Sequence, residues 1–250
     1  MTAFARIDRA DDGEVPAYSA NRLLAALRPA ALAELAPYLT PLELAQDAVL
    51  FDAGDDVETT YLPCGSSLCS LLVVTANGEE IEAANIGREG AVGGVVSAGF
   101  KPAYGRAVVR AAGPAFCLPT GRLEEVKARA PAVADLFARY ADVLIAQMMQ
   151  TVACNALHPI EQRACRWLLG AHDRAGDEPI RLTQETLAQM LGVQRTTISA
   201  VARTLQDAGI INIGRGKVEV LNRAALEKRA CECHDAVEAH FRRILPRVEI

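Results

Sequence analysis

The sequence of 250 residues lacks the marks of several large protein classes. No stretch approaches the roughly 18 uninterrupted apolar residues that a membrane-spanning helix needs, so we expect no membrane partner. The sequence contains no Gly-x-Ser-x-Gly, no phosphate-binding loop and no His-Glu-x-x-His motif. Its only histidines are His158, His172, His234 and His240, all in the C-terminal part. With no catalytic constellation in view, we expect that the protein is not an enzyme.

The first 19 residues are mostly polar and carry no apolar core of the kind that a signal peptide has. We expect a flexible tail over residues 1–19 and a cytoplasmic location. The seven cysteines are an odd number and are scattered along the chain. This usage favours reduced thiols over a disulfide framework.

Basic residues gather toward the C-terminal end, although the formal net charge of the whole chain is -5. Between Arg181 and Arg223 there are six Lys and Arg residues against three Asp and Glu residues. Such a local excess is typical of a compact surface that faces phosphate groups.

The N-terminal half has the texture of short strands separated by turns. Apolar runs at Ala48–Phe51, Leu68–Thr75 and Arg106–Ala112 alternate with Gly, Asp and Pro. The pair Asn77-Gly78 predicts a two-residue hairpin loop in which both residues have a positive φ. With six to eight such strands, preceded by one or two short helices over residues 21–38, we expect a small antiparallel β-roll or jelly roll, because it leaves few exposed edges.

A long helix is expected after the strands. Thr120 is a suitable cap for a helix that runs to about Ala130, and Pro131 can begin a second helix that continues to Leu157 without Gly or Pro. The apolar residues of this second helix cover more than one face, so two surfaces must cover it. The β-roll and a second copy of the helix in a homodimer would do so, and burial inside a large monomer is the alternative. The expected dimer seam is Tyr140, Leu144, Met148 and Thr151.

The C-terminal part has the pattern of a helix-turn-helix followed by a hairpin. A helix is expected from about Ile160 to Asp173, with Cys165, Trp167, Leu168 and Leu169 facing inward. Thr183 is an N-cap for a short helix over 184–191, Gly192 makes a turn, and a second helix runs from Arg195 to Ala208, where Gly209 ends it. Two short β-strands flank Gly214-Arg215-Gly216 and place basic side chains at the hairpin tip.

The second helix of this pair is suited to the major groove of DNA. Its N-terminal turn carries small and hydrogen-bonding side chains, and Arg195 can bind guanine or phosphate. The hairpin is placed to contact the phosphate backbone. The alternative is a three-helix unit with surface charge that does not bind DNA, because such a unit shows a weaker version of the same pattern. The expected DNA-contacting residues are Thr183, Gln184, Gln194, Arg195, Thr196, Thr197, Ser199, Arg203, Arg215 and Lys217.

The run Leu182-Thr-Gln-Glu-Thr-Leu-Ala-Gln-Met-Leu-Gly-Val-Gln-Arg-Thr-Thr-Ile-Ser, with Leu205-Gln-Asp-Ala-Gly-Ile-Ile after it, resembles the winged helix-turn-helix of the Crp/Fnr regulator family. The resemblance implies an α+β protein with four parts: a tail (1–19), a cyclic-nucleotide-binding-like β-roll (20–130), a dimerisation helix (131–157) and a winged helix-turn-helix domain (158–250). It also implies a homodimer on a two-fold symmetric site of double-stranded DNA, with RNA polymerase as a further candidate partner.

Two departures from the family pattern bear on mechanism. The recognition helix begins Arg195-Thr196-Thr197 and has Ala200 where the cyclic AMP receptor branch has a second Arg, so the operator should differ from that branch's. Cyclic-nucleotide pockets of the family pair a Glu on the ribose with an Arg on the phosphate. Glu89 and Arg106 would take these roles here, but Arg106 is displaced by one residue, which turns a strand side chain to the opposite face.

The resemblance therefore leaves the effector and any cofactor unidentified. We expect a regulator whose β-roll senses a small molecule or a redox signal, and the alternative is an effector-independent regulator whose β-roll only supports dimerisation and protein contacts. An enzyme tethered to DNA is a third, unsupported class. We assign no metal site from the sequence. Cys231, Cys233 and His234 are a dense group of soft ligands that could bind zinc or respond to oxidation, or could simply pack in a final helix.

Overall fold

The computed structural model describes residues 17–95, 102–175 and 179–245, so residues 1–16 of the expected tail lie outside the described residues. The β-strands of the N-terminal part are β1 (Thr40–Leu44), β2 (Val49–Phe51), β3 (Thr59–Pro63), β4 (Leu68–Val74), β5 (Glu80–Ile86), β6 (Arg106–Ala111) and β7 (Gly113–Pro119). They are preceded by the helices η1 (Tyr18–Ala20), α1 (Arg22–Ala25), α2 (Pro29–Leu35) and η2 (Ala36–Tyr38). The mixed α+β fold and the short N-terminal helices agree with the expectation from the sequence.

The seven strands form two antiparallel sheets, with the orders β1-β7-β3 and β2-β6-β4-β5. Their facing sides bury a continuous apolar core, which includes Leu42, Tyr61, Ala84 and Val109. The β4–β5 hairpin corrects one prediction. Only Gly78 of the Asn77-Gly78 pair has a positive φ (81°), and the strands pair up to Val74 and Glu80, so the loop is longer than two residues. A single left-handed residue suffices because the longer loop has more positions in which to reverse the chain.

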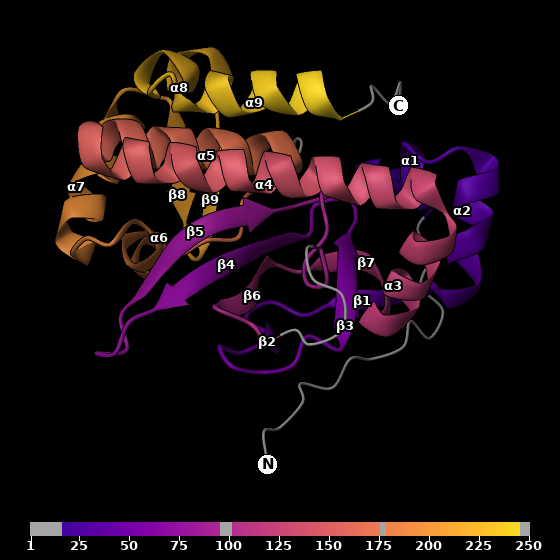
Figure 1. The fold of residues 1–250 in the computed structure, drawn as a ribbon. Helices are drawn as coiled ribbons and strands as arrows, with labels where there is room; N and C mark the ends of the chain where they lie inside the picture. Colours follow the sequence, from indigo (N-terminus) through magenta and orange to yellow (C-terminus); the bar gives the residue numbers. More distant parts are fainter. Residues whose placement is uncertain (1–16, 96–101, 176–178, 246–250) are drawn as a thin grey trace.

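Two helices follow the strands: α3 (Thr120–Arg129) and α4 (Pro131–Leu157). Pro131 begins α4 as predicted. Thr120 does not cap α3, because Pro119 holds the cap position and the Thr120 hydroxyl lies 3.1 Å from the Thr60 hydroxyl instead. In Figure 1, α4 crosses the whole molecule and lies over the edge of the β-roll. No helix in the described ranges is long and apolar enough to cross a membrane.

The C-terminal elements are α5 (Ile160–Ala175), α6 (Gln184–Leu191), α7 (Arg195–Asp207), β8 (Ile211–Gly214), β9 (Lys217–Val220), α8 (Arg223–Arg229) and α9 (Cys233–Ile244). They enclose a second core, in which Trp167, Leu168 and Leu205 are almost fully buried. Helix α9 returns along α4 (Figure 1) and covers part of the long helix.

The C-terminal part is docked on the β-roll by buried polar contacts. Trp167 Nε1 donates to Glu82 Oε1 at 2.7 Å, and Arg174 Nε donates to Glu89 Oε1 at the same distance. Helix α6 packs against β5, where Gly192 lies close to the side chain of Ile81. The two parts therefore form one packed body in this conformation.

Candidate DNA-binding surface

The turn between α6 and α7 follows from local sequence. The Thr183 hydroxyl accepts a hydrogen bond from the Thr186 backbone N–H at 3.0 Å, which satisfies one of the free N–H groups at the start of α6. Gly192 adopts a left-handed conformation with φ 64°, which a side chain would oppose, and ends α6. Ile198, Ala202 and Leu205 anchor α7 in the core. These predicted features are confirmed.

The outer face of α7 is open to solvent. Arg195, Thr196 and Arg203 are exposed, and the Arg195 side chain keeps 68% of its surface accessible. Its guanidinium lies 3.7 Å from the Glu185 carboxylate, which is a loose surface pair. The first turn of α7 thus offers an exposed cation and an exposed hydroxyl beside a helix N-terminus, where phosphate is favoured.

Two of the expected contact residues are used inside the motif. The Ser199 hydroxyl donates to Gln184 Oε1 at 2.6 Å, and both side chains are half-buried. The bond fixes α7 against the start of α6. Gln194 is exposed at the N-cap of α7 and Thr197 is half-buried in its first turn.

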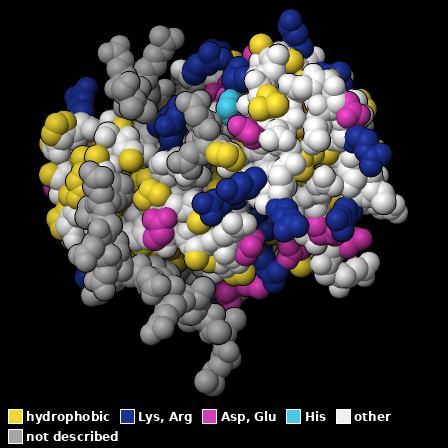
Figure 2. Space-filling model, turned by 180° about the vertical axis from the view of Figure 1, so that it is seen from behind, with side chains coloured by type: hydrophobic (Ala, Val, Ile, Leu, Met, Phe, Trp, Pro, Cys, Tyr) yellow, Lys and Arg dark blue, Asp and Glu magenta, His cyan; other side chains and the backbone are white. Residues whose placement is uncertain are grey.

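The hairpin β8–β9 provides a second basic element. Its strands pair from Ile211↔Val220 to Gly214↔Lys217, and the tip carries the exposed side chains of Arg215 and Lys217. A bridge between Ile180 and Val218 adds a third strand-like segment that holds the hairpin on the domain. In Figure 2, Lys and Arg side chains recur on the side of the molecule that carries these elements, with acidic side chains between them.

Two helices joined by a tight turn and followed by a hairpin with a basic tip form a winged helix-turn-helix. Residues 162–229 match the family of the Crp-like helix-turn-helix domain. The chain has a Crp-like helix-turn-helix domain on a Crp/Fnr-type fold. No curated protein matches the chain in sequence.

Several solved structures share the fold of this chain. FixK2 from Bradyrhizobium japonicum superposes with a TM-score of 0.65 at 16% identity, covering 77% of this chain and 98% of its own. A Crp/Fnr transcriptional regulator from Thermus thermophilus gives 0.61 at 18% identity, over 76% and 97% of the two chains. The c-di-GMP-responsive global regulator CLP from Xanthomonas campestris gives 0.59 at 16% identity, over 77% and 99%. At these identities the similarity establishes the fold.

The two predicted effector residues have different partners. Glu89 is buried, and it bonds to Arg174 and accepts from the Gly87 backbone N–H at 3.0 Å. Burial opposes its charge, but the Arg174 guanidinium outweighs burial and holds the pKa of Glu89 below its ordinary value. Arg106 binds Asp52 at 2.7 Å and also pairs with Glu80. The contacts of the described residues therefore do not bring Glu89 and Arg106 together.

The side chains of the predicted dimer seam pack against other residues of their own chain. Tyr140 is 1% exposed and donates its hydroxyl to the Ala91 carbonyl at 3.1 Å. Leu144 joins the core of the β-roll, with Met148 packed against it, and Thr151 is buried. These side chains offer a partner little surface in this conformation. The exposed apolar side chains of α4 are Ile145, Met149 and Val152, together with Leu157 at its end.

Sequence reasoning missed the contacts that cross between the two parts of the molecule. Trp167 is buried, as expected, but the sequence does not show that its indole N–H bonds to Glu82, which also accepts from Ser70 and Asn85. The glutamate Glu82 in a strand with apolar neighbours was the sequence signal for such a contact. A buried carboxylate needs hydrogen-bond donors from elsewhere in the chain. Its partner, 85 residues away, could not be read from the sequence.

Proposed function

We propose that this Crp/Fnr-type protein is a sequence-specific transcription regulator that binds a two-fold symmetric site on double-stranded DNA as a homodimer. The observation that carries the proposal is the exposed face of α7, where Arg195, Thr196 and Arg203 are open to solvent, together with the basic tip of the hairpin. Side chains of these types read base edges and phosphates when a helix enters the major groove. RNA polymerase is a further candidate partner.

The β-roll is proposed to sense a small molecule or redox signal that is not identified. The support for a regulatory role is its buried contact with the DNA-binding domain, because a change at Glu82 or Glu89 would alter how Trp167 and Arg174 are held. The alternative is an effector-independent regulator, in which the same contacts only fix the domain. Neither hypothesis makes cyclic AMP the effector, because the Glu89 carboxylate, which would bind the ribose, already pairs with Arg174.

We expect Arg195→Ala and Arg203→Ala each to weaken specific DNA binding by about 1–3 kcal/mol, or roughly 5- to 150-fold, with a relaxed preference at one base position. Lys217→Ala should weaken binding about equally for all sequences and reduce the salt slope by about 1. Fluorescence anisotropy with the DNA upstream of the protein's own gene, at two salt concentrations, measures both quantities.

The matched control is Arg122→Ala, which removes an exposed arginine from α3 of the β-roll. Its affinity and salt slope should equal those of the wild type. If Arg195→Ala and Arg203→Ala also bind as the wild type does, α7 does not face DNA and the proposal fails. Adding cyclic nucleotides or reductant to the same titration separates the effector-sensing reading from the effector-independent one.

A further inference from the structure

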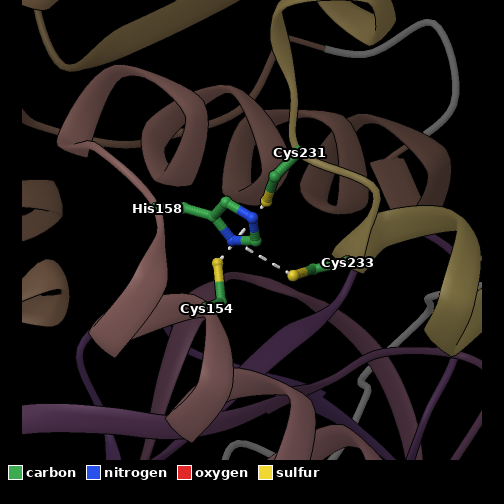
Figure 3. Close-up of side chains that lie close together, drawn as sticks. All are labelled: Cys154, His158, Cys231 and Cys233. Carbon is green, nitrogen blue, oxygen red and sulfur yellow. Dashed lines mark hydrogen bonds between the residues drawn. The ribbon is translucent and has the colours of Figure 1, made fainter.

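Four soft ligands meet where the end of α4 contacts the start of α9. Cys154 lies in the last turn of α4, His158 follows as its C-cap, Cys231 lies just before α9, and Cys233 is the first residue of α9. One donor atom from each of the four side chains lies within 4.8 Å of the others. Figure 3 shows the three sulfur atoms and the imidazole ring of His158 pointing toward one another from the two segments. We call this group the Cys3His cluster.

We propose that the Cys3His cluster binds one zinc ion, held by three thiolates and by Nδ1 of His158. Three sulfurs and one imidazole nitrogen are a donor set of structural zinc sites, in which the protein supplies all four ligands. The inference goes beyond the proposed function and does not depend on it.

The spacing of the donor atoms fits a tetrahedral ion. The Sγ atoms of Cys154 and Cys231 lie 3.5 Å apart, and Cys233 Sγ lies 3.4 Å from His158 Nδ1. Bonds of about 2.3 Å to sulfur and about 2.0 Å to nitrogen place tetrahedral donors roughly 3.5–3.8 Å from one another. These two separations need to change by only a few tenths of an ångström to hold the metal, and all donor pairs lie within 4.8 Å.

The surroundings of the cluster are those that zinc ligands usually have. The other ring nitrogen of His158, Nε2, lies 3.2 Å from the Glu232 carboxylate, which would fix the ring with Nδ1 toward the metal. Gln150 Nε2 donates to Cys233 Sγ at 3.0 Å, and such bonds stabilise a thiolate. Zinc with three thiolates and a neutral imidazole has a net charge of -1, and the nearby Arg163 guanidinium, which interacts with Cys154 and Cys231, would offset it.

Burial favours a structural metal over a redox role for these cysteines. Cys154, Cys231 and Cys233 form a small buried cluster of their own, with exposed fractions of 0%, 5% and 0%. Redox-sensing cysteines are usually accessible to solvent, whereas these three thiols are enclosed. A zinc ion displaces the thiol protons to solvent and so allows the buried sulfurs to ionise.

The ligand set differs from the group that the sequence suggests. His234 turns away from the cluster, because its Nε2 lies 2.9 Å from Asp173 and its Nδ1 lies 3.1 Å from Asp235. His158, 75 residues before Cys233, takes the place that His234 would have in a local motif. The ion would therefore join two distant segments and fasten α9 to the end of the long helix, which closes a long loop of chain.

The test is the metal content and coordination of the full-length protein. Protein expressed with added zinc and purified without chelator should contain about one zinc ion per chain by inductively coupled plasma mass spectrometry, and Cys233→Ser and His158→Gln should each retain less than about a tenth of it. His234→Gln and Cys117→Ser are the matched controls, since neither residue belongs to the cluster, and both should keep the zinc. Circular dichroism identifies any variant that fails to fold.

X-ray absorption of the wild-type zinc protein gives a readout that needs no variant. We expect three sulfur ligands at about 2.3 Å and one nitrogen ligand at about 2.0–2.1 Å. Wild-type protein that takes up no stoichiometric zinc, or a ligand shell rich in oxygen, would overturn the proposal. So would zinc loss in His234→Gln with retention in His158→Gln.

Discussion

Replacing Glu89 by Gln should lower the free energy of unfolding by about 3–5 kcal/mol, because it leaves the Arg174 guanidinium buried without its counter-charge. Both side chains are nearly enclosed, with 9% of the Glu89 side chain and 11% of the Arg174 side chain accessible. Urea unfolding followed by circular dichroism measures the change, and the slope of the transition shows whether it remains a single step.

The control for this prediction is an exposed ion pair. Glu125→Gln removes the partner of Arg122, but the Glu125 side chain is 54% accessible, so the loss should be below about 1 kcal/mol. The double variant Glu89→Gln/Arg174→Met should recover much of the lost stability, since replacing both members of a buried pair by groups of similar volume is often neutral. Equal stability of Glu89→Gln and the wild type would show that the two parts are not held together by this pair.

The same pair predicts a pH dependence of stability. Arg174 holds the pKa of Glu89 in the folded protein below the ordinary value of 4.5. A depressed pKa in the folded state means that the stabilisation is complete above pH 4.5 and is lost as the pH falls through the lower, folded-state value. The wild type should therefore lose stability more steeply than Glu89→Gln between about pH 5 and pH 3. Parallel curves in urea titrations over that range would contradict the prediction.

The parts of the fold that the sequence predicts best are those set by local chemistry. Thr183, Gly192 and Gly209 determine where the helices of the DNA-binding motif begin and end, and the structure follows them to within a residue. The hairpin at Gly78 and the cap of α3 were predicted less well. The β4–β5 loop turns with Gly78 alone at a positive φ, and the Thr120 hydroxyl lies against Thr60, 60 positions away, instead of capping α3.

The candidate site was predictable only where it lies on one continuous segment. The exposed residues of α7 and of the hairpin follow from helix periodicity and turn chemistry. The Glu89–Arg174 pair and the Cys3His cluster each join residues more than 70 positions apart. Periodicity cannot identify such partners, because it describes the face of an element and not what covers that face. Helix α4 shows the same limit: its length and apolar character were predicted, but not which of its faces the β-roll covers.

The outward face of α4 carries a stripe of exposed apolar side chains. Ile145, Met149 and Val152 are spaced by four and three residues, and 52–70% of each side chain is exposed. This is the spacing of a coiled-coil seam, in which matching side chains of a second copy cover each position. The proposed homodimer would therefore bury this stripe, whereas Tyr140 and Leu144 stay against the β-roll of their own chain.

We expect Met149→Glu/Val152→Glu to convert the dimer into a monomer at micromolar concentration. Each fully buried apolar side chain contributes about 1.5–3 kcal/mol, and the two substitutions act in both copies, so the dissociation constant should rise by at least about a thousandfold. Sedimentation equilibrium measures this constant directly. Because a two-fold symmetric site needs both copies, affinity for the upstream DNA should fall with it.

Two further variants locate the seam on the helix. Ala132→Glu adds the same charge at an exposed position in the first turn of α4 and should leave the dissociation constant unchanged. Leu144→Ala should destabilise the chain by about 2–5 kcal/mol through a cavity in the β-roll core but keep the dimer. A monomer from Leu144→Ala together with a normal dimer from Met149→Glu/Val152→Glu would place the interface on the face that the β-roll now covers, and α4 would then have to separate from the roll before two copies associate.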